Sequence, residues 1–94
     1  MADYTVNTSK HATLVATVVD RVSLNNSYGS VDVINRAALG ALFVRTDGTD
    51  PTIAGDDSYA IQNNSERNIA VPASSGIVVR IISSGAGGYS VHGV

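Results

Sequence analysis

The sequence has no cysteine among its 94 residues. It therefore has no disulfide framework and no thiolate metal site, and its stability must come from packing or from a partner. Straight-chain helix formers are also scarce, with four leucines, one methionine and one glutamate, whereas valine and isoleucine together supply 20 residues. Because β-branched side chains suit a pleated sheet better than a helix, the composition predicts an all-β protein.

Charge is low as well, at 15% of residues with a net charge of −2. The six basic residues are scattered along the chain, and DNA- or RNA-binding surfaces usually need a basic stripe, so we expect no nucleic-acid partner. The longest mostly apolar stretch, residues 31–44, is interrupted by polar and charged residues and is shorter than the ~20 residues of a membrane helix. The first residues lack the features of a signal peptide. We therefore expect a soluble protein made in the cytoplasm, with no membrane partner.

Short runs of alternating apolar and polar residues, separated by turn residues, predict the strands. The predicted strands cover residues 13–19 (extending to 24 after a bend at 20–21), 30–35, 39–46, 58–62, 68–71, 77–83 and 89–92. Their centres recur every 8–12 residues or so, which is typical of sandwiches and jelly rolls. We predict one domain over residues 13–94, a small antiparallel β-sandwich or jelly-roll-like barrel of about seven or eight strands. The segment Gly85-Ala86-Gly87-Gly88 predicts a hairpin between the last two strands.

Residues 1–12 form a predicted N-terminal arm. The segment is mostly polar, but Tyr4 and Val6 occupy alternate positions, as in a strand that joins the edge of a neighbouring sheet. Simple terminal disorder is the alternative. Tyr4 and Val6 are therefore the candidate interface residues.

An acidic loop follows the strand at residues 39–46. Its four carboxylates, Asp47, Asp50, Asp56 and Asp57, could bind a hard cation such as calcium. The spacing matches no EF-hand, and Asp, Gly and Pro51 are residues that form turns for other reasons. Turn formation is the favoured interpretation.

Chemistry that depends on histidine or tyrosine has few candidates. His11 and His92 are the two histidines, and no nucleophile motif accompanies either of them. Two histidines without cysteine also make a poor transition-metal site. We therefore predict no enzyme, with no catalytic, cofactor-binding or metal-binding residues and no cofactor. Tyr28 lies in a turn and Tyr4 in the arm, where exposed rings could stack against a sugar.

Three segments of the chain resemble a group of small tailed-bacteriophage virion proteins. They are Val33-Ile34-Asn35-Arg36, the run Ala41-Leu42-Phe43-Val44-Arg45-Thr46-Asp47-Gly48-Thr49-Asp50-Pro51-Thr52, and the C-terminal part from Val79-Arg80-Ile81-Ile82-Ser83-Ser84-Gly85 through Gly88-Tyr89-Ser90-Val91. The likeness covers about residues 13–93, and its motifs consist of strand and turn residues. Members of this group resemble head decoration proteins or small fibre and tail components, with sandwich folds and frequent trimers.

The resemblance implies a virion protein on the capsid surface. Its expected role is to stabilise the capsid exterior by binding major capsid subunits, as a homo-oligomer in which a trimer is favoured. The alternative is a tail- or fibre-associated module that binds a cell-surface glycan. No functional residue transfers with the resemblance.

Overall fold

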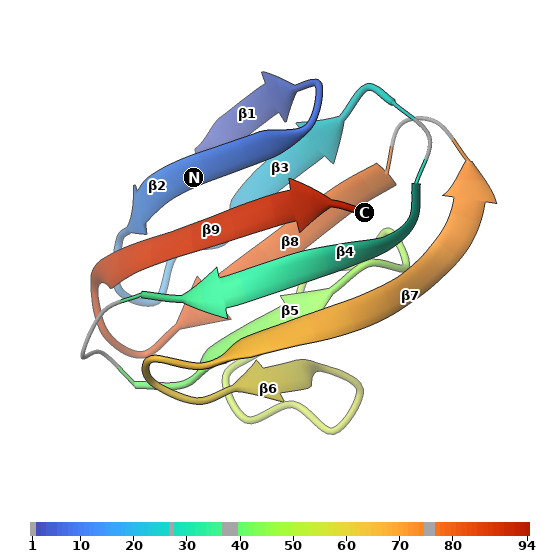
Figure 1. Cartoon of the computed structure of the whole chain (residues 1–94). Helices are drawn as coiled ribbons and strands as arrows, with labels where there is room; N and C mark the ends of the chain where they lie inside the picture. The colour runs from blue at the N-terminus through green and yellow to red at the C-terminus, as the bar shows by residue number, and fades with distance from the viewer. Residues whose placement is uncertain (1, 27, 37–39, 75–76) are drawn as a thin grey trace.

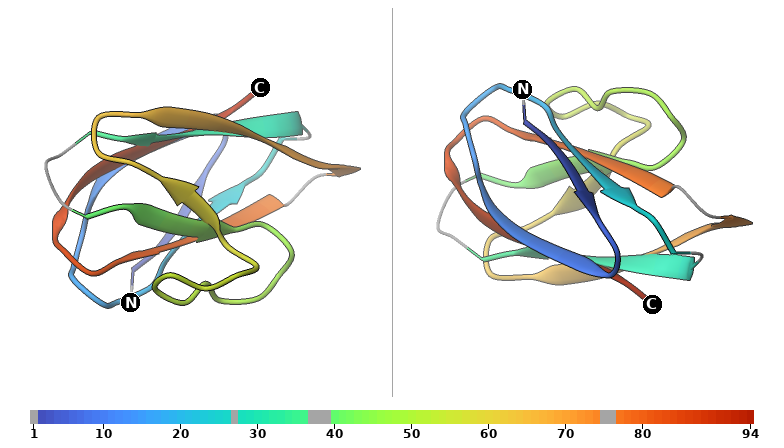
Figure 2. Two further views of the ribbon diagram at one scale, coloured as in Figure 1. Left: turned by 90° about the horizontal axis from the view of Figure 1, so that it is seen from below. Right: turned by 90° about the horizontal axis from the view of Figure 1, so that it is seen from above.

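The computed structural model describes residues 2–26, 28–36, 40–74 and 77–94, and these form nine β-strands and no helix (Figure 1). The described residues accordingly include no helix that could span a membrane. The strands are β1 (Asp3–Val6), β2 (Ser9–Leu14), β3 (Asp20–Leu24), β4 (Tyr28–Asn35), β5 (Leu42–Arg45), β6 (Tyr59–Ile61), β7 (Glu66–Ser74), β8 (Ile77–Ser83) and β9 (Gly87–Gly93). They build a five-stranded sheet in the order β1-β3-β8-β5-β6 and a four-stranded sheet in the order β2-β9-β4-β7. The two sheets face each other as layers of a sandwich (Figure 2).

The eight strands from β2 through β9 pair with one another as in a jelly roll. β2 pairs with β9, β3 with β8, β4 with β7 and β5 with β6, all antiparallel. In the sequence, each of these pairs therefore encloses the pair named after it. From β2 to β9, every connection except β5–β6 passes from one sheet to the other. A long hairpin wound into two facing sheets has this arrangement. The predicted all-β sandwich is confirmed, with one or two strands more than expected.

The additional strand comes from the segment predicted as an arm. β1 pairs with β3 of the same chain, in parallel, with Tyr4 beside Val22 and Val6 beside Leu24. This one pair is the exception to the antiparallel pairing of the predicted sandwich. Parallel neighbours need a crossover connection, and β2, which lies in the other sheet, supplies it.

The core lies between the sheets and consists of alternate residues of each strand. The pattern is clearest in β3, where Val22 and Leu24 are buried, and in β8, where Ile77, Val79 and Ile81 are buried. Burying one such aliphatic side chain stabilises a fold by about 1.5–3 kcal/mol. The β-branched residues that dominate the composition therefore form the inner faces of both sheets.

One strand prediction and one hairpin prediction fail at places where long-range pairing determines the structure. The predicted strand at 13–19 ends at Leu14, and the chain turns there, with Thr17 at φ 61° before β3 begins. The hairpin predicted at 85–88 does not form, because β8 and β9 belong to different sheets and the segment crosses the sandwich. The strand predicted at 39–46 is β5, and residue 39 lies outside the described residues.

Candidate functional site

Three arginines lie side by side on the outer face of the five-stranded sheet. Arg21 of β3 is directly opposite Arg80 of β8, and Arg80 is directly opposite Arg45 of β5. In each strand the residue alternates with buried core positions, so all three side chains lie on the face turned away from the other sheet. Like charges directly opposite each other destabilise a sheet. This arginine row therefore needs counter-charges.

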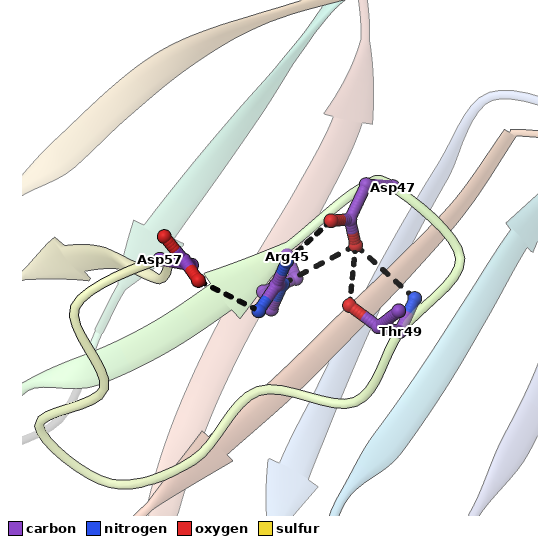
Figure 3. A network of polar contacts seen from close by, with 4 residues as sticks. All are labelled: Arg45, Asp47, Thr49 and Asp57. Atoms are coloured by element: carbon purple, nitrogen blue, oxygen red, sulfur yellow. Dashed lines mark hydrogen bonds and ion pairs between the residues drawn. The ribbon is translucent and has the colours of Figure 1, made fainter.

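The acidic loop after β5 provides the counter-charges. Asp50 accepts a hydrogen bond from Arg80 (Nη1 to Oδ1, 2.8 Å), and its other oxygen lies 3.6 Å from Nη2 of Arg21. Arg45 forms a two-pronged ion pair with Asp47 and also lies 3.9 Å from Asp57 (Figure 3). In the left view of Figure 2 the loop lies beneath the outer side of the five-stranded sheet. The loop is thus held over the arginine row.

Asp47 also organises the start of this loop. Its Oδ1 accepts hydrogen bonds from the backbone N–H of Thr49 (3.1 Å) and from the Thr49 hydroxyl (2.6 Å), and Gly48 between them adopts a φ of +89°. The hydrogen-bonded Arg45 guanidinium, followed by the two hydrogen bonds from Thr49, holds the pKa of Asp47 below its usual range. Turn chemistry and arginine pairing account for Asp47, Asp50 and Asp57. A calcium ion would have to displace the arginines, and no cluster of three acidic or histidine side chains occurs among the described residues.

Both histidines lie on the outer face of the four-stranded sheet, on adjacent strands. Nδ1 of His11 in β2 lies 2.6 Å from Oγ of Ser90 in β9. The centroid of the His11 ring lies 5.4 Å from the centroid of the His92 ring in β9. Asp32 of β4 is opposite His92 in the register, but its carboxylate accepts a hydrogen bond from Asn68 (2.7 Å). Ser90 is fully buried. Among the described residues no carboxylate is hydrogen-bonded to either imidazole, so these residues do not form a catalytic triad.

The candidate interface residues Tyr4 and Val6 pack against the core of their own chain. Both are half-buried, and the Lys10 ammonium lies 4.4 Å from the centre of the Tyr4 ring. Tyr28, expected as an exposed ring, is half-buried and donates a hydrogen bond from its hydroxyl to the backbone carbonyl of Asn7 (3.1 Å). The role of Tyr4 and Val6 in binding a partner stays a prediction.

Several residues that carry the sequence resemblance hold the fold together. Asn35 is fully buried, and its side-chain amide donates to the carbonyls of Gly40 (3.3 Å) and Ile61 (3.2 Å). Arg36 donates to the carbonyl of Tyr89 (3.1 Å). The Asn-Arg pair therefore ties the end of β4 to β6 and β9. Its role in this structure is to connect strands.

The arginine row could not be found from the sequence. Arg21, Arg45 and Arg80 are far apart in the chain, and only the strand register makes them neighbours. The one signal available was that each occupies the polar position of an alternating run. The meeting of His11 and His92, near opposite ends of the chain, was equally hidden.

Comparison with known proteins shows the fold and no more. No protein-family model and no curated protein matches this sequence. Among solved structures, the chain is similar to PirA at 20% identity and a TM-score of 0.64, covering 92% of this chain and 93% of PirA. It is similar to a de novo designed double-stranded β-helix at 14% identity and a TM-score of 0.58, covering 89% and 95% respectively. The lysozyme inhibitor PliG of Salmonella Typhimurium gives 14% identity, a TM-score of 0.52, and coverage of 97% and 95%.

Proposed function

We propose that this protein is a non-enzymatic structural component of a tailed-bacteriophage virion, which decorates the capsid exterior by binding major capsid subunits. The sequence resemblance over residues 13–93 motivates the proposal. Jelly rolls occur in capsid and lectin domains, but a fold by itself does not define a function. The structural observation in its favour is the free edge of β7.

β7 is the last strand of the four-stranded sheet and, among the strands that the structure describes, pairs only with β4. It is nine residues long, and its two charges, Glu66 and Arg67, stand at its start. Pro72 removes one N–H farther along. Between Arg67 and Pro72, the residues Asn68 and Ala70 are exposed and uncharged. Such an edge can accept a further strand, and proteins usually protect long edges with charge. An extended segment of a capsid subunit is the partner that this edge would bind by main-chain hydrogen bonds.

Many weak contacts would add up on a capsid. Each copy needs only a small interface, because neighbouring or oligomeric copies bind with a high effective concentration. We expect a homo-oligomer, with a trimer favoured, on the virion surface. Imaging of particles produced without this gene should show bare and less stable heads, and intact heads with an unchanged surface would overturn the proposal.

A pair of variants tests the edge directly. Ala70→Lys places a charge on the exposed edge strand, and Asn63→Lys adds the same charge in the exposed turn before it. We expect both variants to fold, and Ala70→Lys alone to lower the occupancy of undecorated capsids severalfold in a co-sedimentation assay. Equal binding by both variants would exclude the β7 edge as the contact.

The alternative, a tail- or fibre-associated module that binds a cell-surface glycan, has one structural observation in its favour. Tyr59 of β6 is 38% exposed, and the Arg67 guanidinium lies 4.9 Å from the centre of its ring. An exposed ring beside a polar donor suits the stacking of a sugar. Binding on a glycan array that is lost in Tyr59→Ala would favour this alternative, and absence of binding across a broad array would count against it.

A further inference from the structure

His11 and His92 are the only histidines of the chain, and the pairing of β2 with β9 brings them together. His11 is opposite Ser90 and Ser9 is opposite His92, so the two imidazoles are diagonal neighbours on one face. His11 is exposed and His92 is half-buried. Both rings therefore lie at the surface, on strands held rigidly within the sheet.

Ser90 orients the ring of His11. Its hydroxyl oxygen is 2.6 Å from Nδ1, and the serine is fully buried beneath the imidazole. When Nδ1 carries the proton it donates to Ser90, and the lone pair of Nε2 is then directed away from the serine. A hydrogen bond from the second ring nitrogen is what usually fixes the tautomer of a metal-ligating histidine.

The separation of the two rings is close to the separation that a shared metal ion would require. With a Zn–N bond of about 2.0–2.1 Å and a nitrogen-to-centroid distance of about 1.1 Å, a zinc ion lies about 3.2 Å from each ring centre. A tetrahedral angle then places the two centres about 5.2 Å apart, whereas a right angle places them about 4.5 Å apart. The observed distance is 5.4 Å, with 71° between the ring planes, so the metal-free rings meet edge to face.

We propose that His11 and His92 form a two-imidazole site for a divalent transition metal, for which Zn²⁺ is the probe ion. This inference rests on the geometry of the two rings and is independent of the proposed virion function. Asp32 is held by Asn68 and is not a third ligand, in line with the lack of any three-residue cluster among the described residues. The protein thus supplies two ligands, and water occupies the remaining positions in the isolated chain.

Calorimetric titration of the untagged protein with Zn²⁺ tests the proposal. We expect one site per chain, no comparable binding of Mg²⁺ or Ca²⁺, and at least tenfold weaker binding in His11→Ala and in His92→Ala. Ser90→Ala should weaken zinc binding by about tenfold, the lower end of the range for a residue that orients a ligand. Ser9→Ala, a change on the same face that removes no ligand, should bind zinc as the parent does.

Nitrogen-15 NMR of the imidazoles gives a second measurement. Zinc should shift the Nε2 resonance of His11 and leave its Nδ1 protonated, and Ser90→Ala should allow both tautomers in the metal-free protein. Zinc affinity that is unchanged in the two histidine variants would place the ion elsewhere and overturn the proposal. Absence of zinc binding by the folded parent protein would also overturn it.

Discussion

Tyr89 and Asp20 form a buried polar pair between the sheets. The tyrosine is fully buried, Asp20 is 2% exposed, and the hydroxyl donates to Oδ2 of Asp20 at 2.9 Å. Burial and the neighbouring carboxylate together raise the pKa of Tyr89 well above its usual value. Replacing Tyr89 with Phe keeps the ring in the core and removes only the donor. Asp20 then loses its closest hydrogen-bond partner.

The magnitude follows from the nature of this bond. A hydrogen bond to a charged group contributes about 1.5–3 kcal/mol to stability, so we expect Tyr89→Phe to cost about 2 kcal/mol. In a domain of this size 1 kcal/mol corresponds to roughly 4–8 °C, and the melting temperature should fall by roughly 8–16 °C. The exposed Tyr59→Phe is the matched control, with an expected change within about 0.5 kcal/mol.

Urea denaturation of Tyr89→Phe, Asp20→Asn and the double variant measures the coupling between the two groups. The folded protein holds the Tyr89 proton more tightly than the unfolded chain does. The contribution of the protonated Tyr89 hydroxyl to stability is therefore complete below the unfolded-state pKa near 10 and is lost as the pH rises above that value. Tyr89→Phe should reduce this alkaline loss of stability. A cost below about 0.5 kcal/mol, or additive single changes, would refute the assigned role.

Three further predictions concern the surface and the turns. The pKa of Asp47 is lowered by Arg45, so the contribution of its carboxylate to stability is present above pH ~4 and is lost as the pH falls. In thermal melts, the melting temperature of Asp47→Asn should therefore fall less between pH 7 and pH 3 than that of the parent protein. A Cβ on Gly93 would come within 2.3 Å of the Tyr28 ring, so Gly93→Ala should cost about 1–3 kcal/mol in chemical denaturation. Thr17 adopts a φ of 61°, which is unfavourable for a β-branched residue, so Thr17→Gly should raise the melting temperature by relieving strain of roughly 1 kcal/mol.

The sequence was sufficient to predict a strand where the local alternation of apolar and polar residues coincides with the burial of alternate side chains. β8 was predicted with its observed bounds, because its residues alternate between the core and the outer face from Ile77 to Ile81, after which Ile82 and Ser83 are also buried. The first strand was misplaced for the opposite reason. Residues 15–19 are rich in β-branched side chains, yet pairing of β2 with β9 ends at Leu14, opposite Gly87. That register is set by a strand at the other end of the chain, and local propensity carries no information about it.

The candidate sites depend on register even more strongly than the strands do. Each arginine of the row, and each histidine of the pair, is an ordinary polar residue of an alternating run when it is considered alone. A shift of one residue in β8 or β9 would move the side chain to the opposite face. The predicted hairpin at residues 85–88 shows the same dependence, because nested pairing places β8 beside β3 and β9 beside β2.

The residues that carry the sequence resemblance have structural roles in this fold. Asn35 and Arg36 connect strands through backbone carbonyls, and Asp47 and Asp50 neutralise the arginine row. Sequence similarity based on such residues follows the way the chain folds, whereas the two proposed binding sites use exposed positions such as Ala70 and His11. Because neither of these two residues belongs to the core, changing them separates function from folding. Variants at these positions therefore test the two proposals more directly than variants in the shared motifs.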